Sequence, residues 1–295
     1  MALTLAEAAK LSNDVLLQGV IETIIKDSPV LQRLPFIEIV GNGLTYNREA
    51  TAPSAGFFDV GDTWTESTPT FTQQTVTLKI MGGDADIDNF LIATRSNVQD
   101  LEAAVVELKA KAVRTLFEDT FITGDETLNP KEFDGLDELT DPSQELTMGV
   151  NGGSLTLDKL DELIDTILGG KPDLLLMSRR SRRILNKLAR SAGSFLETDR
   201  DEFGQMLQFY DGIPIGVSDY ISDTQTVGTS TDCSTIYAFQ TGEGALVGLT
   251  APGGLRVERV GSLETKDATR TRIKWYTSLA LFNTVKLANL IGVRP

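Results

Sequence analysis

Apolar residues along this chain follow two different spacings, which predicts a mixture of helices and strands. They recur every three or four positions in residues 1–28, 96–121 and 157–168, as in amphipathic helices. The second of these helices would be about 39 Å long at 1.5 Å per residue. Its expected apolar face consists of Val98, Leu101, Val105, Leu108 and Ala112. Ser96 and Gln99 suit a capping box at its start, and Gly124 is placed to end it.

Strands are predicted where apolar residues alternate with polar ones or form short runs. In 270–282, basic residues and Tyr276 would share one face, with Ile273 and Trp275 opposite. Thr156 and Ser178 are expected to cap two helices between the strands. The resulting fold class is α+β. The predicted strands are 34–40, 75–80, 174–177, 213–217, 236–239, 245–249, 255–260 and 270–282.

Residues 41–74 fit neither pattern. The segment is rich in Gly, Thr, Ser and Pro, and it carries Tyr46, Phe57, Phe58, Trp64 and Phe71. Aromatic side chains favour burial, yet a long loop has little core of its own. Two interpretations stand: a long β-hairpin arm whose aromatics pack on another subunit, or a loop folded back over its own domain.

Composition excludes several kinds of chemistry. The sequence has no histidine and one cysteine, Cys233, which rules out a Ser-His-Asp triad, an imidazole metal site and an internal disulfide. With 27 basic and 42 acidic residues, the net charge is −15, which argues against nucleic-acid affinity over the whole surface. No signal peptide and no apolar run of the roughly 20 residues that span a bilayer are found, so cytoplasmic synthesis is expected.

Candidate sites were tested against the spacing that their chemistry requires. Asp84, Asp86 and Asp88 resemble the start of a calcium loop, but Asn89 and Arg95 stand where such a loop needs Gly and Glu. We therefore favour a polar strand face there. No combination of acid, base and nucleophile is found, so the sequence predicts no catalytic, cofactor-binding or metal-binding residues and no enzyme.

One dense basic patch lies in the helix that follows Ser178. It could bind phosphate or nucleic acid, or it could pair with acidic residues across a subunit contact, which the overall negative charge favours. Residues 197–202 could supply such acids. The patch comprises Arg179, Arg180, Arg182, Arg183, Lys187 and Arg190.

The order of these elements resembles a known family, the major capsid proteins of tailed phages with the Hong Kong 97-type fold. The features that carry the resemblance occur in order over nearly the whole chain. They are the arm ending in Ser28-Pro29, Leu34-Pro35-Phe36, the extended loop, the long helix ending in 121–125, Phe133-Asp134-Gly135-Leu136, 172–178, 212–219, 270–276 and the 288–293 tail.

The resemblance implies a division of the chain into four parts. Residues 1–28 would form an N-terminal arm and residues 44–74 an extended β-hairpin loop. A peripheral domain with the spine helix (about 96–121) would combine 29–43, 75–150 and 251–295. Residues 151–250 would form an axial domain, which converges on the axes of pentamers and hexamers.

The implied function is structural: self-assembly into an icosahedral shell around double-stranded DNA, without sequence-specific binding. The chain would assemble in the host cytoplasm, end in the virion and contact no membrane. A separate scaffolding protein is expected because the chain starts directly at the arm, together with a portal and a decoration protein. No lysine lies between Lys26 and Lys79, so the loop cannot supply the amine for the cross-link that some relatives form.

Subunit contacts are expected in the loop and in the basic patch. The candidate interface residues are Phe57, Phe58, Trp64, Phe71, Arg48, Glu66, Arg179, Arg180 and Arg183. Two other functions stay open. One is an encapsulin-like compartment, in which the same shell fold holds a cargo protein, and the other is a small-molecule enzyme or binding module.

Overall fold

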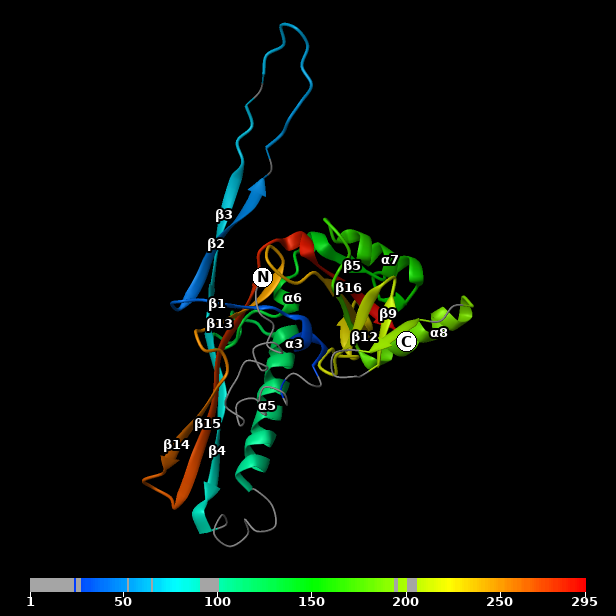
Figure 1. The fold of residues 1–295 in the computed structure, drawn as a ribbon. Helices are drawn as coiled ribbons and strands as arrows, with labels where there is room; N and C mark the ends of the chain where they lie inside the picture. Colours follow the sequence, from blue (N-terminus) through cyan, green and yellow to red (C-terminus); the bar gives the residue numbers. More distant parts are fainter. Residues whose placement is uncertain are drawn as a thin grey trace.

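A computed structural model describes residues 24, 28–51, 53–64, 66–90, 101–193, 196–200 and 206–295 of the 295-residue chain. Within this part, two β-sheets meet around one long helix, and a two-stranded hairpin projects away from both (Figure 1). The predicted N-terminal helix and the capping box at Ser96 and Gln99 lie outside the described residues.

The first sheet has five strands, organised around the 14-residue strand β15 (Ala268–Leu281). One edge of β15 pairs with β4 (Lys79–Asp88), while its other edge pairs first with β14 (Arg256–Ser262) and then with β13 (Leu246–Thr250). Strand β1 (Phe36–Glu38) adds in parallel to β13, after the short helix α3 (Pro29–Arg33). The predicted alternation in β15 is confirmed, because Ile273 and Trp275 are fully buried.

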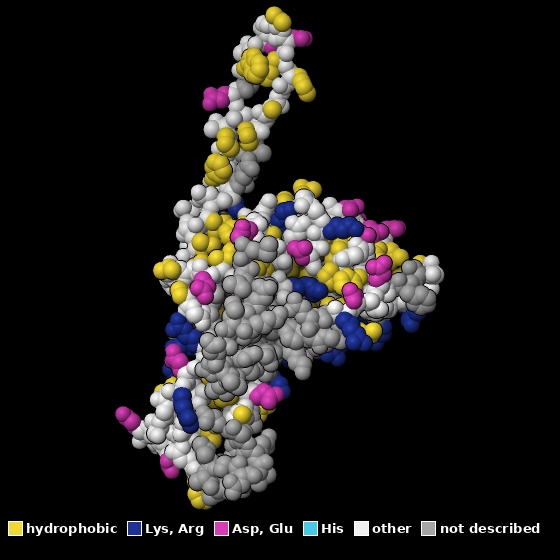
Figure 2. Space-filling view, in the orientation of Figure 1, with side chains coloured by type: hydrophobic (Ala, Val, Ile, Leu, Met, Phe, Trp, Pro, Cys, Tyr) yellow, Lys and Arg dark blue, Asp and Glu magenta, His cyan; other side chains and the backbone are white. Residues whose placement is uncertain are grey.

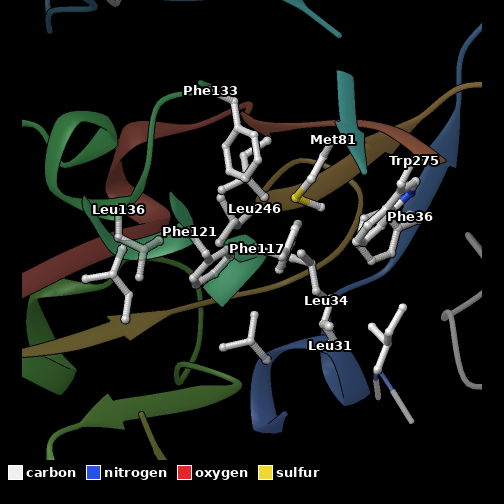
Figure 3. Packing of buried hydrophobic residues seen from close by; sticks show 14 of the residues in the cluster. Leu31, Leu34, Phe36, Met81, Phe117, Phe121, Phe133, Leu136, Leu246 and Trp275 are labelled. Atoms are coloured by element: carbon white, nitrogen blue, oxygen red, sulfur yellow. The ribbon is translucent and has the colours of Figure 1, made fainter. Parts of the chain in front are cut away.

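Helix α5 (Leu101–Thr123) lies against this sheet and supplies much of the core (Figure 3). Val106, Ala110, Val113, Phe117 and Phe121 are all buried, at the three- and four-residue steps of one helix face. The Phe117 ring stacks on Trp275, with ring centroids 5.0 Å apart. The described helix ends at Thr123, two residues beyond the predicted end.

The residue after α5 is Gly124, a position with no room for a side chain. A Cβ at this position would lie 2.3 Å from the carbonyl oxygen of Phe133 and 2.5 Å from that of Thr120. The loop after the helix folds back over it, and the amide of Gly135 donates to the carbonyl of Gly124 at 2.8 Å. Short helix α6 (Leu136–Leu139) and the 3-10 turn η1 (Pro142–Gln144) then lead into the second sheet.

The second sheet has nine strands. Seven follow one path: β5 (Glu145–Thr147), β16 (Leu287–Arg294), β12 (Ser230–Phe239), β7 (Leu174–Met177), β10 (Ile213–Val217), β9 (Met206–Tyr210) and β8 (Glu197–Arg200). Strand β6 (Gly153–Ser154) pairs with β16, and β11 (Gln225–Val227) pairs with β12. A 3-10 turn, η2 (Thr284–Lys286), joins β15 to β16.

Helices α7 (Leu157–Thr166) and α8 (Arg179–Ser191) cover one face of this sheet. Strand β7 is buried on both faces: Leu175 and Met177 pack with the two helices, while Leu174 and Leu176 join the core around α5. The predicted caps are confirmed, since Thr156 accepts from the amide of Lys159 and Ser178 from that of Ser181.

Three details of the predicted pattern are wrong. The apolar face predicted for the long helix is not its buried face, because Leu108 is 65% exposed and Ala112 is exposed, while the buried residues are Val106, Ala110 and Val113.

The other two errors concern the ends of elements. Residues 75–80 are not one strand, because β3 (Thr70–Thr77) ends in the hairpin and β4 begins at Lys79, which leaves Ile80 exposed. The apolar stripe predicted over 157–168 includes Leu168, but α7 ends at Thr166 and Leu168 is exposed.

The two sheets draw strands from both sides of the expected domain boundaries. Strand β13 belongs to the five-stranded sheet although it precedes residue 251. Strands β5 and β16 belong to the nine-stranded sheet although they lie outside 151–250. Backbone pairing of β13 and of β16 therefore links the expected peripheral and axial regions, and the boundaries themselves stay a prediction.

Candidate subunit-contact surfaces

The projecting hairpin is built from strands β2 (Gly43–Thr51) and β3. They pair antiparallel from Gly43 opposite Thr77 to Thr51 opposite Thr70, with one register shift near Glu49. Beyond the ladder the described residues of 53–69 contain no strand, and a turn from Asp59 to Asp62 places Gly61 at φ +97°. The segment is thus a hairpin that stands clear of the sheets and is not folded back over them (Figure 1), while the packing of its aromatics on another subunit stays a prediction.

The base of the hairpin is fixed to the end of β15. The Tyr46 hydroxyl donates to the carbonyl oxygen of Leu281 at 2.9 Å, and the Arg48 guanidinium donates to the same oxygen. The Tyr46 ring packs edge-on against Phe282, with centroids 4.8 Å apart. Arg48 is therefore engaged within its own chain, and a subunit contact by this residue stays a prediction.

The outer part of the hairpin exposes most of its aromatic surface. Phe57, Trp64 and Phe71 have relative exposures of 108%, 77% and 65%. Phe58 is the exception, because its ring stacks on Trp64 with centroids 4.4 Å apart. Glu66 is exposed as well. Such apolar side chains contribute favourable free energy only when another surface covers them.

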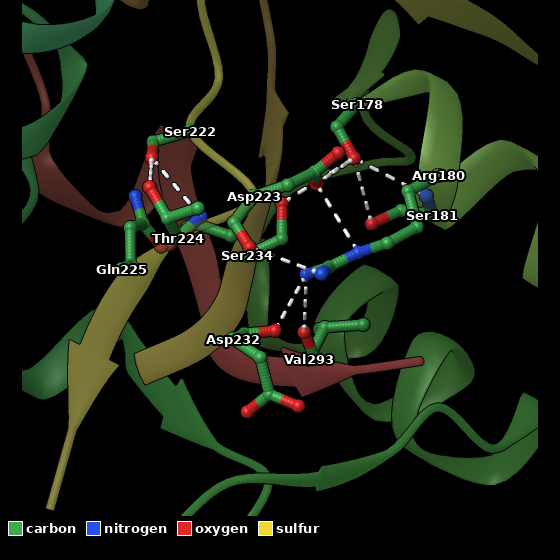
Figure 4. A network of polar contacts seen from close by, with 11 residues as sticks. Ser178, Arg180, Ser181, Ser222, Asp223, Thr224, Gln225, Asp232, Ser234 and Val293 are labelled. Atoms are coloured by element: carbon green, nitrogen blue, oxygen red, sulfur yellow. Dashed lines mark hydrogen bonds and ion pairs between the residues drawn. The ribbon is translucent and has the colours of Figure 1, made fainter. Parts of the chain in front are cut away.

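Within the basic helix α8, Arg180 differs from its neighbours. Its side chain is 14% exposed, and its Nε lies 3.3 Å from a carboxylate oxygen of Asp223 (Figure 4). Its terminal nitrogens donate to the backbone carbonyls of Asp223 and Asp232 at 3.0 and 2.8 Å. Arg180 thus ties the start of α8 to the sheet, a role that the charge pattern alone did not predict.

The other arginines of α8 face outward. Arg179 forms an exposed ion pair with Asp219, while Arg182 and Arg183 are exposed. A hollow of about 580 Å³ runs along this side of the helix. It is lined by Arg179, Arg182, Arg183, Asn186, Ala189, Arg190, Leu196 and Gln208. Glu197–Arg200, part of the predicted acidic partner segment, is a fully exposed strand, and 201–202 lie outside the described residues.

The acidic run at Asp84 is a polar strand face, as favoured from the sequence. Ala85 and Ile87 are buried on one side of β4, and the aspartates face basic residues of β15 on the other. Arg272 donates to both carboxylate oxygens of Asp84 at 2.6 and 2.8 Å, and Arg270 does the same for Asp86 at 2.6 and 2.7 Å. These hydrogen bonds lower the pKa of Asp84 and of Asp86.

One polar contact near the core was missed entirely. The Tyr237 hydroxyl on β12 donates to a carboxylate oxygen of Asp137 on α6 at 2.5 Å. Desolvation by burial raises the pKa of Asp137 and that of Tyr237. The two residues are 100 positions apart, so the fold and not the local sequence brings β12 and α6 together here.

Neither a metal cluster nor a membrane-spanning helix is present in the part of the chain that the structure describes. No group of three or more His, Cys, Asp or Glu residues there could hold a metal ion. None of the helices in that part is long and apolar enough to cross a membrane.

Three solved structures are similar over nearly the full length of the chain. The SrpI encapsulin complex from Synechococcus elongatus PCC 7942 has a TM-score of 0.71 at 19% identity, covering 100% of this chain and 97% of that chain. The capsid of an empty GTA particle gives 0.70 at 15% identity, covering 90% of both chains. Mycobacterium phage Bobi gives 0.62 at 14% identity, with 90% of both chains covered.

At such identities, these likenesses establish the fold alone, which is the Hong Kong 97-type capsid fold expected from the order of elements. No curated protein matches the chain. The model of the phage capsid family matches residues 11–282, almost the whole sequence. This chain therefore belongs to the phage capsid family.

Proposed function

We propose that this chain is the major capsid subunit of a tailed phage, which assembles in many copies into an icosahedral shell around double-stranded DNA. The observation that carries the proposal is the projecting hairpin, in a chain of the phage capsid family. Its aromatic residues have no core of their own and are exposed in the single chain. A neighbouring subunit in a shell would cover them.

Many weak contacts would give such a shell its strength. Each hairpin contributes a few aromatic anchors, and a closed shell engages every subunit at several contacts at once. In this proposal residues 44–74 reach across a neighbour, residues 1–28 act as an arm, and 151–250 surround the axes of pentamers and hexamers. Assembly would take place in the host cytoplasm, with a separate scaffolding protein, a portal and a decoration protein as further partners.

The net charge of −15 suits a container for DNA. Phosphate contacts need lysine and arginine, and a predominantly acidic chain has few to offer. The shell would retain the genome by enclosing it and not by binding it tightly, so the DNA could leave.

An encapsulin-like compartment is the second candidate. The observation that favours it is the similarity to the SrpI encapsulin, which extends over 100% of this chain. In that case the same shell would enclose a protein cargo and no genome.

Expression of the full chain, alone and with candidate scaffolding proteins, would test the proposal. We expect closed particles by light scattering and negative-stain electron microscopy, with nuclease-protected DNA when the packaging machinery is present. Particles that copurify with a defined protein and lack nucleic acid would favour the compartment. A chain that remains monomeric in all these conditions would contradict both.

A further inference from the structure

Two helices on the same face of the nine-stranded sheet carry opposite charge. Helix α7 holds four acidic residues and one basic residue, and helix α8 holds six basic residues and no acidic one. Both sets follow helical spacing: 158, 161, 162 and 165 on α7, and 179, 182, 183, 187 and 190 on α8. Each helix therefore presents a charged stripe on the side away from its buried residues.

The chain neutralises only part of each stripe. On α8, Arg179 and Arg180 pair with Asp219 and Asp223. On α7, Lys159 pairs with Glu162. Within the described part of the chain, no ion pair is made by Arg182, Arg183, Lys187 or Arg190 on α8, or by Asp158, Asp161 or Asp165 on α7.

Like charges three and four residues apart on a helix repel one another and destabilise it. The α8 stripe therefore gains stability from an anionic partner. The hollow beside it is lined by Arg179, Arg182, Arg183 and Arg190, and the Asn186–Gln208 amide pair fixes its floor with two hydrogen bonds of 3.1 Å. This surface is concave and basic, and it suits a convex acidic element.

We propose that the α8 stripe of one copy binds the α7 stripe of the next copy around a ring; this rests on the proposed shell function. Figure 2 shows basic side chains gathered near α8 and acidic ones near α7. Contact between two different patches is heterologous, and its repetition closes a ring when the rotation between copies is a whole fraction of a turn. The α7 stripe is about 10 Å long and the α8 stripe about 16 Å at 1.5 Å per residue, so the acidic stripe can lie within the basic one.

Charge reversal tests the contact directly. The α8 variant carries Arg182→Glu and Arg183→Glu, and the α7 variant carries Asp158→Lys and Asp165→Lys; all four residues are exposed. Each variant places like charges opposite one another and should lower particle yield at least tenfold. The chain with all four substitutions should recover most of the yield. A control with Lys131→Glu and Lys266→Glu, both exposed, matches the charge change of the α8 variant and should assemble normally.

Mixing the two variants gives a more specific readout. For this readout the reversal covers the whole unpaired stripe, with Lys187→Glu and Arg190→Glu added to the α8 variant and Asp161→Lys added to the α7 variant. The α8 variant then has two acidic stripes and the α7 variant two basic ones, so they can join only in alternation. Alternation closes a ring of six but not a ring of five, because a five-membered ring must place two like copies side by side. We expect the mixture to form hexameric rings with pentamers depleted, as counted by native mass spectrometry.

Three outcomes would overturn the inference. If the reversed variants assemble like the wild type, the stripes do not meet. If the α8 variant fails and the four-fold variant does not rescue it, the partner of α8 is another anion, such as packaged nucleic acid. If the wild-type chain forms no particles under any condition, the shell function falls and this inference falls with it.

Discussion

The hairpin and the core around α5 use the same kind of residue to opposite ends. Phe117 and Trp275 stack 5.0 Å apart and are fully buried, while Phe57 and Trp64 extend into solvent. In the core, aromatic area stabilises the single chain. In the hairpin, the same area is exposed and can contribute only when another surface covers it. Folding and assembly thus depend on separate residues, and mutations should affect one without the other.

Removal of a core ring should have the largest effect on the fold. Phe117→Ala leaves a cavity beside Phe36, Phe121, Phe133 and Trp275, and it should reduce the free energy of unfolding by about 3–5 kcal/mol. Urea denaturation of the unassembled chain measures this loss. Leu116→Ala, one position earlier and half exposed, is the matched control and should cost far less.

Loss of Arg180 should come next. Arg180→Ala removes the donor to the carbonyls of Asp223 and Asp232 and the cation beside Asp223, whose carboxylate keeps its hydrogen bond from Ser178, and it should cost about 1–3 kcal/mol. Arg183→Ala removes an exposed arginine of the same helix and should change stability by less than about 0.5 kcal/mol. Equal thermal denaturation midpoints for the two variants would show that the network in Figure 4 does not stabilise the fold.

Trp64→Ala should have the opposite effect to a core substitution: little change in stability and a large loss of assembly. The free energy of unfolding should change by less than about 0.5 kcal/mol, because the ring is 77% exposed in the single chain. Particle yield should fall at least tenfold, because aromatic anchors dominate interface energetics. Leu128→Ala, which removes an 85% exposed side chain outside the hairpin, is the control for lost apolar area. Normal assembly of Trp64→Ala would exclude this residue as an anchor.

The smallest expected effects concern how stability depends on pH. The ion-paired Asp84 and Asp86 should differ in this respect from the buried Asp137. Asp84 and Asp86 have lowered pKa values, so their contribution to stability is present above the unfolded-state pKa and is lost as the pH falls through the folded value. The pKa of Asp137 is raised, so its contribution is lost as the pH rises through the folded value.

The matching variants should therefore shift stability in different pH ranges. Replacing Arg270 and Arg272 with Gln should weaken the chain at neutral pH and flatten its loss of stability below about pH 4. Asp137→Asn should leave acid stability unchanged and raise stability at neutral pH. Chemical denaturation at a series of pH values measures both, and identical profiles for both variants would contradict the assigned pKa directions.

Local pattern was enough to predict the parts of this fold that depend on neighbours in sequence. The caps Thr156 and Ser178 and the alternation in β15 follow from spacing alone. For the long helix, spacing predicted the helix but not its buried face, since Leu108 and Ala112 are exposed and Val106 and Val113 are buried instead. The sheet partners could not be predicted, because β15 pairs with three strands that come from separate, earlier parts of the chain. The roles of Arg48 and Arg180 were missed for the same reason, since their acceptors, such as Leu281 and Asp232, are distant in sequence.

The shared carbonyl of Leu281 gives the hairpin the mechanics of a lever. Tyr46 and Arg48 fix the base of the arm at the end of β15, where Leu44 and Val76 also pack against the sheet, and Figure 1 shows the described part of the arm beyond the ladder standing clear of the sheets. A nine-residue strand spans about 30 Å, so a tilt of about 10° at that pivot moves the far end by about 5 Å. Identical subunits can thereby contact their neighbours at slightly different angles, as a closed curved shell would require, while the core of each subunit stays unchanged.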